Sequence, residues 1–153
     1  TIGILMPSPG LLHSGSFEGF CDPAIIERYC REAGIELLIV FGSHARGKAR
    51  PGSDVDLAVQ PVRGVEVDKL QLIFDLGEIF SPHEVDVVIL SPLTSPLLLH
   101  EIFFNGRLLF EAGPGLFKKG RMRAWKLYED TAPLRQRQKE TLARFVERRH
   151  RVP

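Results

Sequence analysis

The sequence predicts an α+β fold in which a small mixed β-sheet is flanked by helices and followed by a C-terminal helical extension. Segments with the length and pattern of strands occur at residues 37–41, which are apolar, and at residues 54–59 and 84–90, which carry acidic residues among apolar ones. The segments between and around them carry apolar residues at helical spacing. The order helix, strand, strand, helix, strand, helix, strand indicates a mixed sheet covered by helices.

The first helix is predicted to start after Asp22, a residue type that caps helices, with Pro23 at the first helical position. Gly34 should end it. The apolar residues of this segment share one face, which should pack on the sheet: Ile25, Ile26, Tyr29, Cys30 and Ala33. The preceding residues 1–20 are rich in Gly, Ser and Pro and are expected to form a flexible leader.

The buried strand at residues 37–41 runs directly into Gly42 and Ser43. A small residue at this point lets backbone N–H groups approach an anion closely. If a short helix opens near Ser43, its N-terminus and the hydroxyl would face a phosphate. The loop that follows is basic and suits a triphosphate, with Arg46 as the candidate phosphate contact.

The strand at residues 54–59 alternates polar and apolar residues, so Asp54 and Asp56 should project from one face. Residues two apart on a strand are roughly 6.5–7 Å apart, close enough to converge on two cations about 3.5–4 Å from each other. The strand at residues 84–90 offers a third carboxylate, Asp86, with Glu84 as its rival. Oxygen ligands of this kind favour Mg²⁺ or Mn²⁺.

Two further helices are expected within the domain. The first covers roughly residues 65–80 and ends at Ser81-Pro82. Its inward face is predicted to comprise Val67, Leu70, Ile73, Phe74 and Gly77. The second covers residues 96–104 and precedes the last strand, which ends near Glu111.

The tail beyond Pro114 is predicted to form two helices, at residues 116–130 and 133–149, with Pro133 marking the break. Residues 1–116 hold 8 Lys and Arg against 15 Asp and Glu, whereas residues 117–153 hold 12 against 4. This basic arm either packs on its own domain or docks a partner protein or an RNA. One Trp and one Tyr do not make a stacking platform, which disfavours sequence-specific RNA reading.

The chain is expected to divide into a leader at residues 1–20, a catalytic domain at 21–113 and a basic helical extension at 114–153. The net charge of +1 gives no overall attraction to nucleic acid. Cys21 and Cys30 fit neither a zinc pattern nor a disulfide framework, which suggests a reducing cytoplasm. No apolar run approaches a membrane span, and residues 1–20 lack the positive start of a secretory signal. We therefore expect a cytoplasmic protein.

The pattern Gly42-Ser43, ten residues, Asp54-x-Asp56 and a later strand with Asp86 resembles the minimal nucleotidyltransferase (MNT) family of the DNA polymerase beta superfamily. The resemblance covers roughly residues 35–111 and implies the polymerase-beta-like nucleotidyltransferase fold. It implies that Asp54 and Asp56 hold two metal ions, and that Asp86 completes the first metal site and helps to activate a hydroxyl. Gly42 and Ser43 would hold the β and γ phosphates, and pyrophosphate would leave.

Small members of this family are typically encoded beside HEPN-domain proteins, which they modify with AMP as antitoxins. The resemblance thus implies a Mg²⁺-dependent enzyme that transfers a nucleoside monophosphate, with ATP as the expected donor, to a hydroxyl of a HEPN toxin. Three alternatives stay open: a non-catalytic binding antitoxin, an aminoglycoside-type nucleotidyltransferase and an RNA nucleotidyltransferase. The nucleotide base, the acceptor residue and the oligomeric state are left undetermined.

Overall fold

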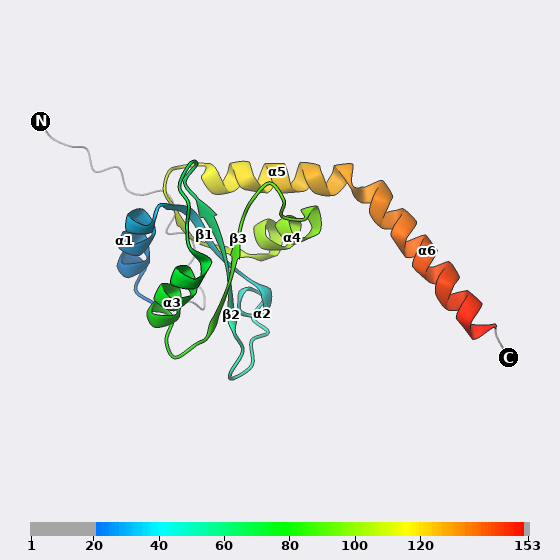
Figure 1. The fold of residues 1–153 in the computed structure, drawn as a ribbon, viewed down its shortest axis with the longest axis horizontal. Coiled ribbons are helices and arrows are strands. Elements are labelled where there is room, and N and C mark those ends of the chain that lie inside the picture. Colours follow the sequence, from blue (N-terminus) through cyan, green and yellow to red (C-terminus); the bar gives the residue numbers. More distant parts are fainter. Residues whose placement is uncertain (1–20, 152–153) are drawn as a thin grey trace, which may run out of the picture.

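The protein is described by a computed structural model that covers residues 21–151, so the leader predicted at residues 1–20 lies outside the described residues. Within this part of the chain, one mixed sheet has the order β3-β2-β1-β4 (Figure 1). Its strands are β1 (Ile35–Phe41), β2 (Val55–Pro61), β3 (Val85–Ile89) and β4 (Arg107–Glu111). Strand β1 is antiparallel to both β2 and β4, and β2 is parallel to β3. The predicted α+β fold is confirmed.

Helices cover both faces of this sheet because the central strands alternate their buried side chains between the two faces. Leu38, Val40 and Leu57 face α1 (Pro23–Ala33) and α3 (Lys69–Ile79). Leu37, Ile39 and Ala58 belong to the second core cluster, with residues of α4 (Pro96–His100), the π-helical turn η1 (Glu101–Asn105) and α5 (Leu116–Asp130). Each fully buried aliphatic side chain contributes about 1.5–3 kcal/mol to folding. Figure 1 shows α1 and α3 on one side of the sheet and α4 and α5 on the other.

Helix α1 begins and ends as predicted. The Asp22 side chain accepts a hydrogen bond from the Ala24 backbone N–H at 2.9 Å, and Gly34 closes the helix in the left-handed conformation. Ile26 and Cys30 are buried, while Ile25 is 43% exposed at the edge of the predicted face. One narrow stripe therefore anchors this helix to the sheet.

Helix α3 differs from its prediction in both its start and its buried face. It begins at Lys69 because the Asp68 carboxylate caps it, accepting from the Leu70 backbone N–H at 2.9 Å. The predicted inward residues Leu70 and Phe74 are 77% and 62% exposed, whereas Leu72 and Leu76 are buried. Apolar residues surround more than half of this helix, so their spacing alone does not select the buried face.

The predicted helix at residues 96–104 is divided between α4 and the π-helical turn η1, which leads into β4. Ile102 and Phe103 of this turn are buried against the sheet. A π-turn shifts the helical register by one residue and is frequent at functional sites. Here it places Glu101 toward the loop after β1, as described below.

The two tail helices behave differently. Helix α5 packs on the body, where Ala124 is buried and Gly120 lies against Phe103. A Cβ at Gly120 would lie 2.5 Å from Phe103 Cε1, so only glycine permits this approach. Helix α6 (Ala132–His150) has no buried residue and projects from the body (Figure 1). The part of the chain that the structure describes contains no helix long and apolar enough to cross a membrane.

Candidate functional site

The candidate phosphate turn lies where β1 ends, and the predicted short helix is present as α2 (Gly42–Ala45). Gly42 adopts φ +71°, a left-handed conformation that favours glycine. A Cβ on this residue would lie 2.3 Å from the Asp56 carboxylate oxygen Oδ2. The turn is therefore seated directly against Asp56, and any side chain at position 42 would collide with that carboxylate.

The three candidate acidic residues lie at the same end of the neighbouring strands β2 and β3. Asp56 and Asp86 are register partners in the parallel pairing, so their side chains project from the same face of backbones about 4.8 Å apart. Asp54 lies immediately before β2 and is exposed, while Asp56 is half-buried. Glu84, the rival of Asp86, precedes β3, and its carbonyl accepts from the Val55 backbone N–H at 2.8 Å.

The electrostatics of this cluster centre on Asp56. Burial raises the pKa of its carboxyl above the usual value of 3.8, and the negative charges of Asp86 and Asp54 raise it further. The nearby His44 acts in the opposite direction and lowers it. Ionised Asp56 is thus destabilised by its surroundings, and a cation bound between the carboxylates would relieve this repulsion.

The donor set fits a hard divalent cation, because it consists of carboxylate oxygens, which Mg²⁺ and Mn²⁺ prefer. Among residues 21–151, no three His, Cys, Asp or Glu side chains are already grouped so as to hold a metal ion. Strand register places Asp56 beside Asp86, and Asp54 is exposed and lies just before β2, outside the hydrogen-bonded strand. Metal binding would therefore draw in side chains whose backbones are already adjacent.

Arg46, the predicted phosphate contact, is paired with a residue far along the chain. Its guanidinium forms an ion pair with Glu101 of the π-helical turn. Glu101 also accepts a hydrogen bond from the Asn105 side-chain amide at 2.8 Å. A phosphate contact by Arg46 would require exchange of this exposed ion pair, and it stays a prediction.

His44 is a residue of the site that the sequence did not single out. Its Nε2–H donates to the Ser53 carbonyl oxygen at 3.0 Å and so ties α2 to the segment that precedes Asp54. Its ring also lies edge-on to that of His83, with centroids 5.6 Å apart. Its place between Ser43 and Arg46 was the available signal. The presence of a histidine at position 44, however, does not by itself predict a hydrogen bond to Ser53, nine residues further along the chain.

Comparison with known proteins agrees with this architecture. The sequence profile of the family described as polymerase beta, nucleotidyltransferase matches residues 24–114. No curated protein sequence matches the chain. A chain of a toxin–antitoxin complex solved with AMP-PNP has a similar fold at 20% identity and a TM-score of 0.66, covering 80% of this chain and 98% of the other.

Two further solved structures share the fold. One is a complex of tri-AMPylated Shewanella oneidensis HEPN toxin with MNT antitoxin, with 19% identity and a TM-score of 0.61 over 79% of this chain and 95% of the other. The second is the toxin–antitoxin complex MntA-HepT, with 19% identity and a TM-score of 0.61 over 79% and 96%. Because the family profile spans more than half of the chain, the protein belongs to the polymerase beta nucleotidyltransferase family and is a nucleotidyltransferase.

Proposed function

We propose that this protein transfers AMP from ATP to a hydroxyl of a partner protein, that the reaction depends on Mg²⁺, and that the partner is a HEPN toxin which the modification neutralises. The observation that carries this proposal is the seating of Gly42 against Asp56, with Asp86 in register beside it. This geometry supports the proposal that a phosphate-binding turn lies next to a set of cation ligands. Complexes with a similar fold that contain AMP-PNP or an AMPylated HEPN toxin support the choice of nucleotide and partner.

In this proposal, Asp54, Asp56 and Asp86 hold the metal, for which Mn²⁺ could substitute. When bound, the cation neutralises charge at the α-phosphate and lowers the pKa of the attacking hydroxyl. Ser43 and the backbone amides after Gly42 hold the β and γ phosphates. Asp86 helps to remove the hydroxyl proton as the new O–P bond forms and the bond to pyrophosphate breaks.

The proposal is tested by incubating the purified protein with Mg²⁺, each α-labelled nucleoside triphosphate and lysate from its source. A variant that combines Asp54→Asn and Asp56→Asn is compared with Asp130→Asn, which changes an exposed carboxylate at the end of α5. We expect ATP to label one protein band with the wild type and the control, but not with the double variant. Label on RNA or on a small molecule would favour the corresponding transferase instead.

The antitoxin role is tested by growth of cells that co-express the labelled partner. Neutralisation that persists with the Asp54→Asn, Asp56→Asn variant would show that binding alone suffices and would refute the catalytic account. Loss of neutralisation while the complex persists would support it.

Cys21 and Cys30 are both free thiols, which agrees with our proposal of a cytoplasmic location.

A further inference from the structure

Helix α6 presents an apolar surface that no other helix or strand of the described chain covers. It is 19 residues long and has no buried residue. Leu134, Leu142, Phe145 and Val146 are each more than half exposed. In proteins, most of the stability of a helix comes from tertiary packing of its apolar face and not from helix propensity. Both facts indicate that a binding partner covers α6.

The exposed apolar side chains of α6 lie together on one face. At 100° per residue, the four residues Leu134, Leu142, Phe145 and Val146 form a single stripe, which we call the docking face. Arg137, Arg144 and Arg148 follow each other at spacings of seven and four, so they line one edge of this stripe. In all, α6 carries six Lys and Arg against two Glu. Arg149 falls within the stripe itself, and its guanidinium lies over the Phe145 ring at 5.4 Å from the centroid. The surface thus combines exposed apolar side chains with arginines at one edge and one arginine over Phe145.

The direction of α6 is set by contacts at its junction with α5. The Arg135 guanidinium stacks over the Tyr128 ring at 3.6 Å from its centroid. Arg135 also donates to the Thr131 hydroxyl at 2.8 Å, and that hydroxyl donates to the Leu127 carbonyl at 2.8 Å. With this bend, α6 turns toward the side of α5 on which α4 and α2 lie (Figure 1).

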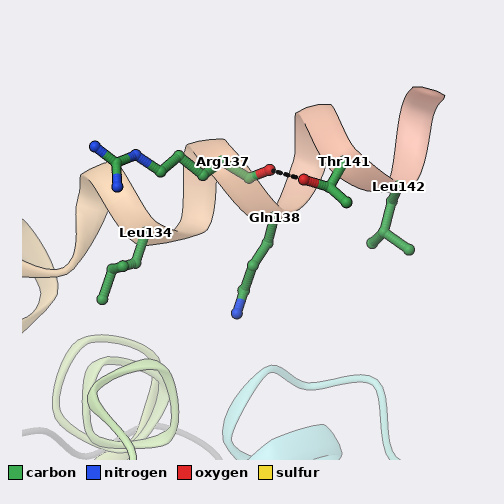
Figure 2. Close-up of a pocket in the computed structure, with 5 residues that line it drawn as sticks. All are labelled: Leu134, Arg137, Gln138, Thr141 and Leu142. Carbon is green, nitrogen blue, oxygen red and sulfur yellow. Dashed lines mark hydrogen bonds between the residues drawn. The ribbon is translucent and has the colours of Figure 1, made fainter. Parts of the chain in front are cut away.

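An open hollow of about 510 Å³ lies along this side of α6, and all the residues that line it belong to that helix, among them Leu134, Gln138 and Leu142. Figure 2 shows these three side chains pointing to the side of the helix on which the ribbon of the body lies. The body there includes α2, which begins with Gly42. A partner that contacts this face of α6 would therefore lie on the side of the molecule that carries the candidate site.

We infer that α6 is the docking arm for the acceptor protein, which contacts it through an amphipathic helix with an apolar centre and a carboxylate-rich edge. This inference rests on the proposed function. Carboxylates are needed to match the arginine edge, and an apolar stripe along one helix is matched by the apolar stripe of a second helix packed against it. An RNA would satisfy the arginines but leave Leu142 and Phe145 exposed. A second α6 would bring two basic helices together.

Site-specific photocrosslinking identifies the occupant without relying on catalysis. In the full chain, p-benzoylphenylalanine replaces Phe145 on the docking face, or Glu147 on the opposite face as the control, in cells that naturally produce the protein. We expect the probe at position 145, but not at 147, to crosslink to the protein that wild type labels with AMP. Crosslinks to a second copy, to RNA, to an unlabelled protein or to nothing would overturn the inference.

A quantitative test uses the full chain with Leu142→Gln and Phe145→Gln, compared with Glu147→Gln. Because neither apolar side chain is buried, the variant should fold and bind ATP as wild type does. We expect at least a tenfold loss of affinity for the purified acceptor and a matching rise in its KM. Unchanged affinity and KM would refute the docking arm. If wild type labels no protein at all, the proposed function itself fails, and the inference fails with it.

Discussion

Replacing Gly42 with Ala tests the contact on which the proposed site depends. The new Cβ would lie 2.3 Å from Asp56 Oδ2 and 3.2 Å from Asp56 Cγ, so the carboxylate must move. The backbone at φ +71° adds a second cost, because a side chain there meets the following carbonyl. We therefore expect both the stability of the fold and the binding of Mg²⁺ and ATP to fall.

The magnitude follows from separating these two costs. The left-handed conformation costs a non-glycine residue about 1–2 kcal/mol, and displacing a packed group costs about 1–3 kcal/mol. Gly64→Ala is the matched control, because Gly64 has φ +84° and no atom within 4 Å of an added Cβ. It should incur only the first cost. Gly42→Ala should therefore lower the free energy of unfolding by about 2–5 kcal/mol.

The assay is urea denaturation of both variants, repeated in an Asp56→Ala background, with calorimetric titration of ATP and Mg²⁺. Removing the Asp56 carboxylate should reduce the cost of Gly42→Ala to that of Gly64→Ala, a coupling of about 1–3 kcal/mol. Nucleotide affinity should fall with Gly42→Ala but not with Gly64→Ala. Equal costs for the two variants, in stability and in affinity, would refute the reasoning.

Three further predictions concern the carboxylates and the thiols. Asp86→Asn should slow nucleotidyl transfer about 100-fold or more, whereas Glu84→Gln should retain most of the activity; the reverse result in a single-turnover assay would reassign the third ligand. Burial and neighbouring carboxylates raise the pKa of Asp56, so stability is lost as pH rises from 3.8 to that raised value, and the full cost remains at higher pH. In EDTA, Asp56→Asn should therefore melt at a higher temperature than wild type at pH 7, with the difference vanishing below pH 3.8; a lower melting temperature at pH 7 would contradict this. Burial raises the pKa of Cys30 to about 12, so a thiol reagent should modify Cys21 first and Cys30 only after unfolding. Modification of both thiols at the same rate in the folded protein would contradict this prediction.

Much of the fold was predictable because its signals are local. The apolar alternation of β1 and β2 needs only neighbouring residues, as does the Asp22 cap of α1. Gly42 at the end of a buried strand is a local signal of the same kind. The buried face of α3 was predicted wrongly at Leu70 and Phe74, although Val67 and Ile73 do pack against the core. Apolar residues surround much of this helix, and only contact with the sheet selects Leu72 and Leu76.

The arrangement of the site depended on contacts between distant segments. The sequence could not choose between Asp86 and Glu84 as the third carboxylate. In the structure, the parallel register pairs Asp86, and not Glu84, with Asp56. The ion pair of Arg46 with Glu101 joins residues 55 positions apart. Such partners are chosen by packing, which no local pattern encodes.

The sequence by itself determined the strands, most of the helix positions and the motif that marks this protein as a nucleotidyltransferase, because spacing and side-chain chemistry are properties of neighbouring residues. It also predicted a basic tail, but not which half of it would pack. Only the tertiary structure decided that Gly120 brings α5 against Phe103 while α6 stays uncovered. The contact of Gly42 with Asp56 was likewise decided only by the tertiary structure. The packing of Gly120 and the contact of Gly42 both depend on how elements distant in the sequence fill the same space.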